Sequence, residues 1–178
     1  MLPVDLVIIF TMLLIIGMMV TSVYGFIAGV PYVPTPHPVA RAMVDLARLR
    51  GTENVMDIGA GNGRVLIEAK RKHPSIDATG IELAPTVWLL GKLNIFLSGI
   101  RIRFIRGNAF DHDMSRTDVI FLYLSPAVMA KLEDKFDREL KPGTVVISHA
   151  FTFPRRQPVE MTALPGWMGK KTIRRYEW

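Results

Sequence analysis

The sequence contains no cysteine. Without thiols, the chain has neither a disulfide framework nor a thiolate metal site. Charge is also missing from one region, because residues 6–30 carry no charged side chain and no Lys or Arg precedes Arg41. The part from Arg41 onward holds all 22 basic residues and all but one of the 16 acidic residues, so its net charge is +7. That charge suits an anionic membrane, an acidic protein or a nucleic acid, and does not choose among them.

The uncharged region is long enough to cross a bilayer, since a spanning helix needs about 20 apolar residues. A helix that lies on the membrane surface would have a polar face, and this region has none. A signal peptide would begin with a basic segment, and none precedes this region. The sequence therefore predicts a transmembrane anchor over residues 1–30, with cleavage as a signal peptide left open. The arginines that follow, at 41, 48 and 50, predict a single-pass protein of the cell membrane whose C-terminal domain is cytoplasmic.

Residues 31–51 have a composition of their own. The segment Pro31-Tyr32-Val33-Pro34-Thr35-Pro36 cannot be helical and favours a stiff, extended strap. Apolar residues then recur at helical spacing from 39 to 49, which predicts an amphipathic cover helix. The strap is either a plain spacer or a cover over a site, in which case Tyr32 and Thr35 are candidate catalytic residues.

From residue 52 to 178 short apolar runs alternate with amphipathic stretches. This alternation predicts a Rossmann-like α/β domain with an open, twisted and mostly parallel sheet. The chain ends with two apolar runs joined across Pro165-Gly166, which predict a C-terminal antiparallel hairpin. The expected strands span 54–58, 78–83, 102–106, 118–124, 144–151, 159–164 and 171–178, and the expected helices span 64–72, 86–97 and 127–140.

The first expected strand runs into Asp57-Ile58-Gly59-Ala60-Gly61-Asn62-Gly63. Glycines there let the backbone approach a ligand and turn sharply into a helix. The second strand ends at Glu82, where a carboxylate can accept both hydroxyl hydrogens of a ribose. A dinucleotide-binding domain is the main rival, but its fingerprint is G-x-G-x-x-G whereas this loop reads G-x-G-x-G.

At these residues the sequence resembles class I, seven-strand S-adenosylmethionine-dependent methyltransferases. The resemblance implies that the acid before the glycines lies near the methionine moiety, that Glu82 holds the ribose, and that the segment after the third strand grips the adenine. Asn108 stands where the family usually has an acid, and its amide oxygen can still accept from the adenine. The implied cofactor-binding residues are Asp57, Gly59, Gly61, Gly63, Glu82, Leu83, Asn108 and Ala109.

A narrower resemblance covers most of the chain. An apolar N-terminal segment, Pro-Tyr-Val-Pro-Thr, a short helix and then the cofactor motif are similar to the membrane-anchored protein-lysine methyltransferases of the ATP synthase c subunit and the adenine nucleotide translocase. The late Phe151-Thr152-Phe153-Pro154 is similar to their segment after the fifth strand. The resemblance implies methylation of lysine in a membrane-embedded or membrane-near protein.

The fourth strand ends at Tyr123-Leu124-Ser125-Pro126, where residues that face the substrate lie in this fold. Tyr123 can offer its ring to a cation or its hydroxyl to an amine, and Ser125 lies beside it; both are candidate catalytic residues. Tyr123 can equally be the end of a buried strand. The segment is not Asp-Pro-Pro-Tyr or Asn-Pro-Pro-Tyr, the pattern of enzymes that methylate exocyclic or amide nitrogens, which argues against an adenine or glutamine target.

The sequence thus predicts a lysine N-methyltransferase that uses S-adenosylmethionine and acts on a protein. Two alternatives stay open: methylation of a lipid, quinone or other small amphiphile, and a non-catalytic module that binds S-adenosylmethionine and regulates a membrane partner. No nucleic-acid partner is expected. No metal is expected either, since the adjacent Asp111-His112-Asp113 offers no further ligands.

Overall fold

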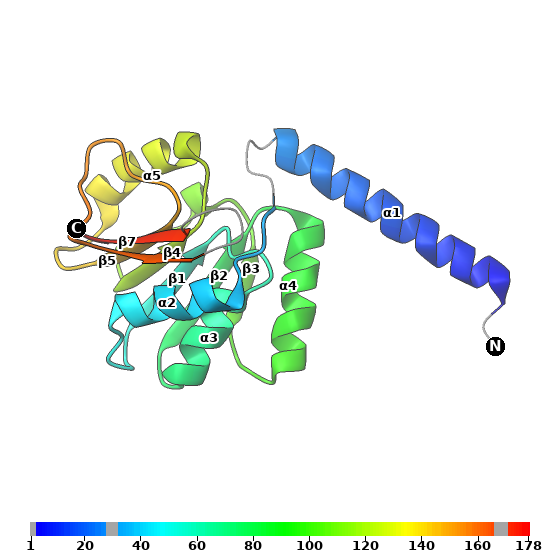
Figure 1. Ribbon diagram of the computed structural model, residues 1–178, viewed down its shortest axis with the longest axis horizontal. Coiled ribbons are helices and arrows are strands. Elements are labelled where there is room, and N and C mark those ends of the chain that lie inside the picture. Colours follow the sequence, from blue (N-terminus) through cyan, green and yellow to red (C-terminus); the bar gives the residue numbers. More distant parts are fainter. Residues whose placement is uncertain (1–2, 28–31, 166–170) are drawn as a thin grey trace.

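The computed structural model describes residues 3–27, 32–165 and 171–178. Pro31, which begins the predicted strap, and Gly166, in the predicted hairpin connection, lie outside the described residues. Figure 1 shows one α/β domain, from which the N-terminal helix α1 (Val4–Ile27) extends away.

A seven-stranded sheet in the order β3-β2-β1-β4-β5-β7-β6 forms the centre of the described domain. The first five strands run parallel, whereas β7 is antiparallel to both β5 and β6. This agrees with the predicted mostly parallel sheet and its C-terminal antiparallel hairpin. The strands are β1 (Asn54–Ile58), β2 (Asp77–Glu82), β3 (Arg103–Arg106), β4 (Val119–Leu122), β5 (Val145–His149), β6 (Glu160–Leu164) and β7 (Lys171–Glu177).

Helices cover both faces of this sheet, because strand residues alternate between two apolar cores. In β4, for example, Val119 and Phe121 join the core under α2 and α3, while Ile120 and Leu122 join the core under α5. A third cluster joins α3 to α4, which packs against β2 and β3. The helices are α2 (His37–Ala47), α3 (Arg64–Lys72), α4 (Pro85–Ser98) and α5 (Pro126–Glu139), with a short 3-10 helix η1 (Ala109–Asp111) after β3.

The first part of the predicted fold needs a correction. A membrane span requires enough helix length and enough apolarity along that length. Among residues 3–27, 32–165 and 171–178, no helix meets both requirements. The prediction of a transmembrane anchor in residues 1–30 considered the apolar run in the sequence alone. It is wrong, and so is the single-pass membrane location that was inferred from it.

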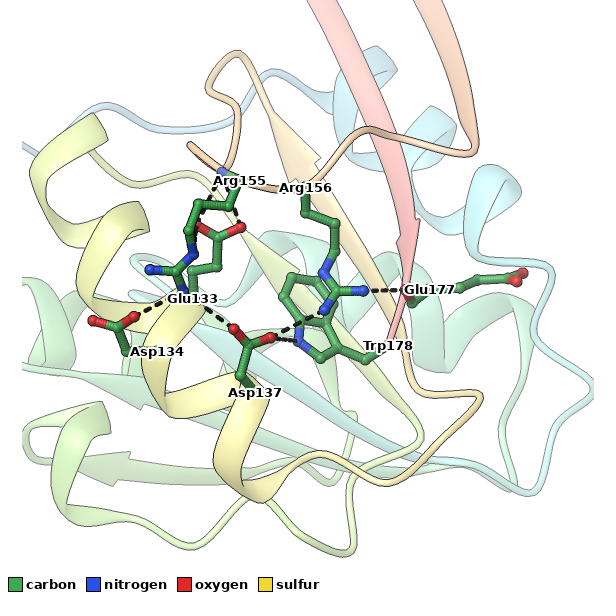
Figure 2. A network of polar contacts seen from close by, with 7 residues as sticks. All are labelled: Glu133, Asp134, Asp137, Arg155, Arg156, Glu177 and Trp178. Carbon is green, nitrogen blue, oxygen red and sulfur yellow. Dashed lines mark hydrogen bonds and ion pairs between the residues drawn. The ribbon is translucent and has the colours of Figure 1, made fainter.

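The end of the chain is fastened to α5 by the network in Figure 2. The backbone N–H of Arg155 donates to both carboxylate oxygens of Glu133, a side chain that is almost completely buried. The Arg156 guanidinium donates to Asp137 at 3.0 Å and lies 4.1 Å from the ring centroid of Trp178. The indole N–H of Trp178 donates to the same Asp137 carboxylate at 2.9 Å. These contacts fix the segment that follows β5.

Candidate active site

A cavity of about 510 Å³ opens at the carboxyl ends of the parallel strands. The cavity lies at the topological switch point of the sheet, between β1 and β4, because β2 and β3 follow on one side of β1 and β4 and β5 on the other. Ligands of such sheets usually bind at this point. Its lining brings together residues from β1, β2, β4, the loop after β3 and the strap before α2. Of the predicted site residues, the lining includes Tyr32, Thr35, Asp57, Gly59, Gly61, Glu82, Leu83, Asn108, Ala109 and Tyr123.

The glycine loop forms the floor of this cavity in a conformation that requires glycine. Gly59 and Gly61 have φ values of +70° and +56°, which L side chains rarely adopt. A Cβ atom on Gly59 would also lie 2.7 Å from the Leu124 side chain. The positive φ therefore strains any other residue at position 59, and an added Cβ would also displace the end of the Leu124 side chain.

Glu82 holds the glycine loop in place. One of its carboxylate oxygens accepts from the Gly61 N–H at 2.9 Å, and the other accepts from the Ala84 N–H at 2.8 Å. Each oxygen keeps a second lone pair for a ligand. The carboxylate is thus oriented before any ligand binds, and hydrogen bonds to a charged group contribute about 1.5–3 kcal/mol each.

Asp57 lies beside Glu82 at the end of β1 and is 5% exposed. Burial raises the pKa of Asp57 to about 8, and the nearby Glu82 carboxylate acts in the same direction. The carboxyl is thus largely protonated at neutral pH until a positive charge reaches it. A cationic ligand group would favour the ionised form of this acid.

Asn108 caps the short helix η1, because its side-chain oxygen accepts from the Phe110 N–H at 3.1 Å. The remaining lone pair and the NH₂ group stay available for a ligand. Asn108 and Ala109 lie on the cavity wall after β3, and their contact with the adenine stays a prediction.

The strap lies directly on the glycine loop. A Cβ atom on Gly61 would approach the ring of Tyr32 to 3.1 Å, so this ring covers the loop at van der Waals distance. The Arg64 guanidinium donates to the Thr35 carbonyl oxygen and ties the strap to the start of α3. Burial raises the pKa of Tyr32; Arg64 opposes that shift and Glu82 adds to it.

Two predicted site residues do not line the cavity. Gly63 lies at the N-terminus of α3 with φ +73°, and a Cβ there would lie 2.9 Å from Ile95. It serves the packing of α3 against α4. Ser125 lies at the N-terminus of α5, and its buried hydroxyl oxygen has no hydrogen-bond partner within the described part of the chain.

The structure also adds residues that the sequence analysis missed. Arg64 and Lys131 line the cavity, as do the apolar side chains of Val33 and Val128. Arg64 follows the glycine loop directly, so its position was a usable signal. Lys131 lies in the second turn of α5, and no motif in the sequence marks it.

The residues present fit S-adenosylmethionine, the cofactor that the resemblance implies. The cavity is within the usual range for small-molecule sites, about 300–1,000 Å³. Asp57 and Glu82 place two carboxyls where a cation and a ribose are expected. Within the described residues, no group of three or more His, Cys, Asp or Glu side chains is arranged to hold a metal ion.

Comparisons with known proteins agree with this geometry. The family model described as ANTKMT methyltransferase domain matches residues 57–160. A protein-lysine N-methyltransferase of Saccharolobus islandicus is 35% identical over 139 residues, which are 77% of this chain and 86% of that protein. A lysine N-methyltransferase of the ATP synthase c subunit, from Xenopus laevis, is 30% identical over 72% of this chain, and the match spans only 56% of that longer relative.

Among solved structures, the chain is similar to an RNA methyltransferase from Salinibacter ruber in complex with S-adenosyl-L-homocysteine. The TM-score is 0.75 and the identity 35%, over 82% of this chain and 93% of that one. The predicted methyltransferase activity and the predicted cofactor are therefore confirmed. The chain belongs to the ANTKMT methyltransferase domain family and is an S-adenosylmethionine-dependent methyltransferase.

Proposed function

We propose that this chain methylates the ε-amino group of lysine in a protein. The observation that carries the proposal is the place of Tyr123, which lines the same cavity as Asp57 but from β4, on the opposite side of β1 from Glu82. An aromatic ring there suits a flexible aliphatic amine. The names of the relatives from Saccharolobus islandicus and Xenopus laevis support the same substrate class.

When bound, S-adenosylmethionine supplies a methyl group on a positively charged sulfur, and the amine receives it in line with loss of one proton. The ordinary lysine pKa is about 10.4, so the amine must be deprotonated before it can attack. Leu124 and Val128 give this side of the cavity apolar walls, which lower the pKa of an incoming amine. The Lys131 ammonium on the same lining acts in the same direction, because a like charge disfavours the protonated amine.

The strap contributes by covering the cofactor side of the cavity. Tyr32 rests on the glycine loop, and the Thr35 carbonyl is bound by Arg64. Such a cover excludes water and restricts the approach of the amine, and positioning of this kind supplies a large share of methyl-transfer rates. We thus propose residues 31–51 as a functional cover and residues 52–178 as the catalytic domain.

RNA is the second candidate substrate, because the Salinibacter ruber neighbour is described as an RNA methyltransferase. The 22 basic residues of this chain are compatible with it. Against it, the β4 end reads Tyr123-Leu124-Ser125-Pro126 and lacks the Asp/Asn-Pro-Pro-Tyr pattern of enzymes that methylate exocyclic amines. Lysine is therefore the preferred acceptor.

One labelling experiment separates the candidates. The purified protein is incubated with methyl-tritiated S-adenosylmethionine and a whole-cell extract, which is then divided into protein, RNA and organic fractions. We expect acid-stable label in protein that is recovered as methyl-lysine after hydrolysis. Label in RNA or in the organic fraction would replace lysine with a nucleobase or a small amphiphile. Cofactor binding without any transfer would indicate a non-catalytic module.

A further inference from the structure

His149, at the carboxyl end of β5, has no role in the cofactor site. It is 1% exposed, and its ring centroid lies 4.2 Å from that of Tyr123, with the two planes inclined by 45°. Neither ring nitrogen has a hydrogen-bond partner among the described residues. A buried polar group without a partner costs about 1–3 kcal/mol, so the nitrogens do not stabilise the fold, and what the structure shows for this side chain is the contact of its ring with Tyr123.

The backbone after His149 makes an unusual turn. Ala150 has φ +69°, and the Phe151 N–H donates to the His149 carbonyl at 2.9 Å, which closes a three-residue γ-turn with positive φ. Such turns are rare and strained for a residue with a side chain. The Ala150 N–H donates to the Thr172 carbonyl at 2.9 Å, and the Arg174 guanidinium donates to the Ala150 carbonyl at 2.8 Å. Contacts from β7 therefore hold the strained turn in place.

The turn brings a second aromatic ring to Tyr123. The ring of Phe151 stacks on that of Tyr123 at a centroid separation of 6.1 Å and an interplanar angle of 20°. Strained backbone persists where the surrounding structure over-determines it, and it clusters at functional sites. Tyr123 lines the cavity, whereas His149 and Phe151 do not.

We propose that His149 and Phe151 are positioning residues that fix the ring of Tyr123 at the wall where the target amine binds. This inference rests on the proposed lysine methylation. A fixed aromatic wall restricts the approach of the uncharged amine to the methyl group. A ring that rotates freely does not provide this restriction.

The competing explanation is that His149 acts as the general base, and the pKa values of the two groups argue against it. Burial, helped by the positive charges of Lys171 and Arg174, lowers the pKa of His149 to about 4. Lysine ordinarily has a pKa of about 10.4, so proton transfer to this imidazole is strongly unfavourable. The neutral ring instead supports Tyr123 without placing a further positive charge near the sulfonium and the amine.

The test uses the full chain with poly-L-lysine as acceptor and compares three variants of the cluster with one control variant. We expect His149→Leu and Phe151→Ala to lower kcat about tenfold, which is about 1.4 kcal/mol of transition-state stabilisation. The affinity for S-adenosylhomocysteine, measured by calorimetry, should stay unchanged in both. His149→Phe, which keeps a ring and removes both nitrogens, should restore most of the kcat. His73→Leu, in a half-buried histidine that ends α3, is the matched control and should leave kcat unchanged.

Two results would overturn the inference. If His149→Phe lost as much kcat as His149→Leu, the ring nitrogens and not the ring would carry the function. If His149→Leu and Phe151→Ala lowered cofactor affinity together with kcat, the cluster would only stabilise the fold. If His149→Leu does not fold, the affinity and kcat of Phe151→Ala decide this point. The unmodified protein is assayed before the variants. If it forms no methyl-lysine, the proposed function itself is contradicted.

Discussion

The two sides of the cavity differ in how completely their polar groups are partnered. On the cofactor side, formed by β1, β2 and β3, Glu82 binds two backbone N–H groups and Asn108 binds one. The substrate side is lined by the end of β4 and by α5. Behind that lining, Ser125 and His149 bury polar atoms that have no hydrogen-bond partner among the described residues. The first side is oriented in advance, whereas the second depends on ring packing around Tyr123.

This difference follows from what each side binds. The cofactor side receives the same molecule in every turnover, so preoriented carboxylates and backbone dipoles favour binding without reorganisation. For the proposed lysine acceptor, the substrate side receives a flexible side chain of another protein, for which shape and charge matter more than fixed hydrogen bonds. Substitutions on the first side should therefore change affinity for the cofactor, and those on the second should change turnover.

The largest effect is expected for Glu82→Ala. The substitution removes the ligand's acceptor and also releases the N–H groups of Gly61 and Ala84. We expect cofactor binding to weaken by about 3 kcal/mol, or more than 100-fold, since each charge-assisted hydrogen bond contributes about 1.5–3 kcal/mol. Calorimetry with S-adenosylhomocysteine measures this. Asp77→Ala, an exposed acid at the opposite end of β2, is the control, and equal affinities in the two variants would refute the preoriented carboxylate.

The second prediction concerns the pH dependence of stability that Asp57 causes. The pKa of this carboxyl rises from its ordinary value of 3.8 to about 8 in the folded protein. Between these values the unfolded chain has lost the proton that the folded chain keeps. The stability that Asp57 contributes is therefore complete below pH 3.8 and falls as pH rises towards 8, by up to about 1.4 kcal/mol per pH unit.

Asp57→Asn should remove this slope, which amounts to about 2 kcal/mol between about pH 6.5 and 8. Denaturant unfolding at several pH values gives the free energy of unfolding of the unmodified protein and of Asp57→Asn. Groups that titrate in the same way in both proteins, His149 included, cancel in the difference between the two. S-adenosylmethionine should also release a proton from Asp57 on binding near neutral pH, visible as a buffer-dependent binding enthalpy. Parallel stability curves for the two proteins would contradict the raised pKa.

The same contrast explains how much could be predicted from the sequence. The cofactor side depends on local signals, because Asp57, Gly59 and Gly61 are consecutive parts of one turn and Glu82 ends the next strand. The alternation of apolar runs likewise predicted the parallel sheet and the terminal hairpin. Ten of the twelve proposed site residues line one cavity.

The substrate side was predicted less well for physical reasons. The importance of His149 depends on contacts with Tyr123 and with β7, which are distant along the chain, and the strained turn at Ala150 has no glycine to mark it. Lys131 reaches the cavity only through the orientation of α5. The transmembrane prediction was wrong because it rested on the apolar run in the sequence alone, whereas no helix of the described residues is long and apolar enough to cross a membrane.

The third prediction tests whether the strap belongs to the cofactor side or only connects α1 to the domain. Tyr32→Ala removes the ring that covers Gly61, and should lower turnover about tenfold, or about 1.4 kcal/mol. Arg64→Leu, which releases the Thr35 carbonyl, should also lower turnover, but by a smaller factor. Thermal melting should change little in Tyr32→Ala, because that ring is 37% exposed. Normal turnover after replacement of residues 32–36 by Gly and Ser would show that the strap is only a spacer.

The smallest effect is expected for Arg156→Ala, which weakens the network of Figure 2 beside the substrate side. Its guanidinium donates to Asp137 and lies over Trp178. An exposed ion pair contributes about 0–1 kcal/mol and a cation–π contact about 0.5–1 kcal/mol. We expect a loss of about 1 kcal/mol, or a melting temperature lower by about 2–4 °C in a chain of this size.

The two sides of the cavity then give different expectations for activity in Arg156→Ala. Cofactor affinity should be unchanged, because the network contacts α5 and the segment after β5 and none of the residues around Glu82. Turnover should fall slightly, since the same segment carries Phe151 towards Tyr123. Arg71→Ala, which removes a weak surface ion pair to Glu68 on α3, is the matched control and should change neither quantity. A loss of cofactor affinity in Arg156→Ala would mean that the two sides are coupled through the sheet, and the distinction between a preoriented side and a packing-dependent side would then fail.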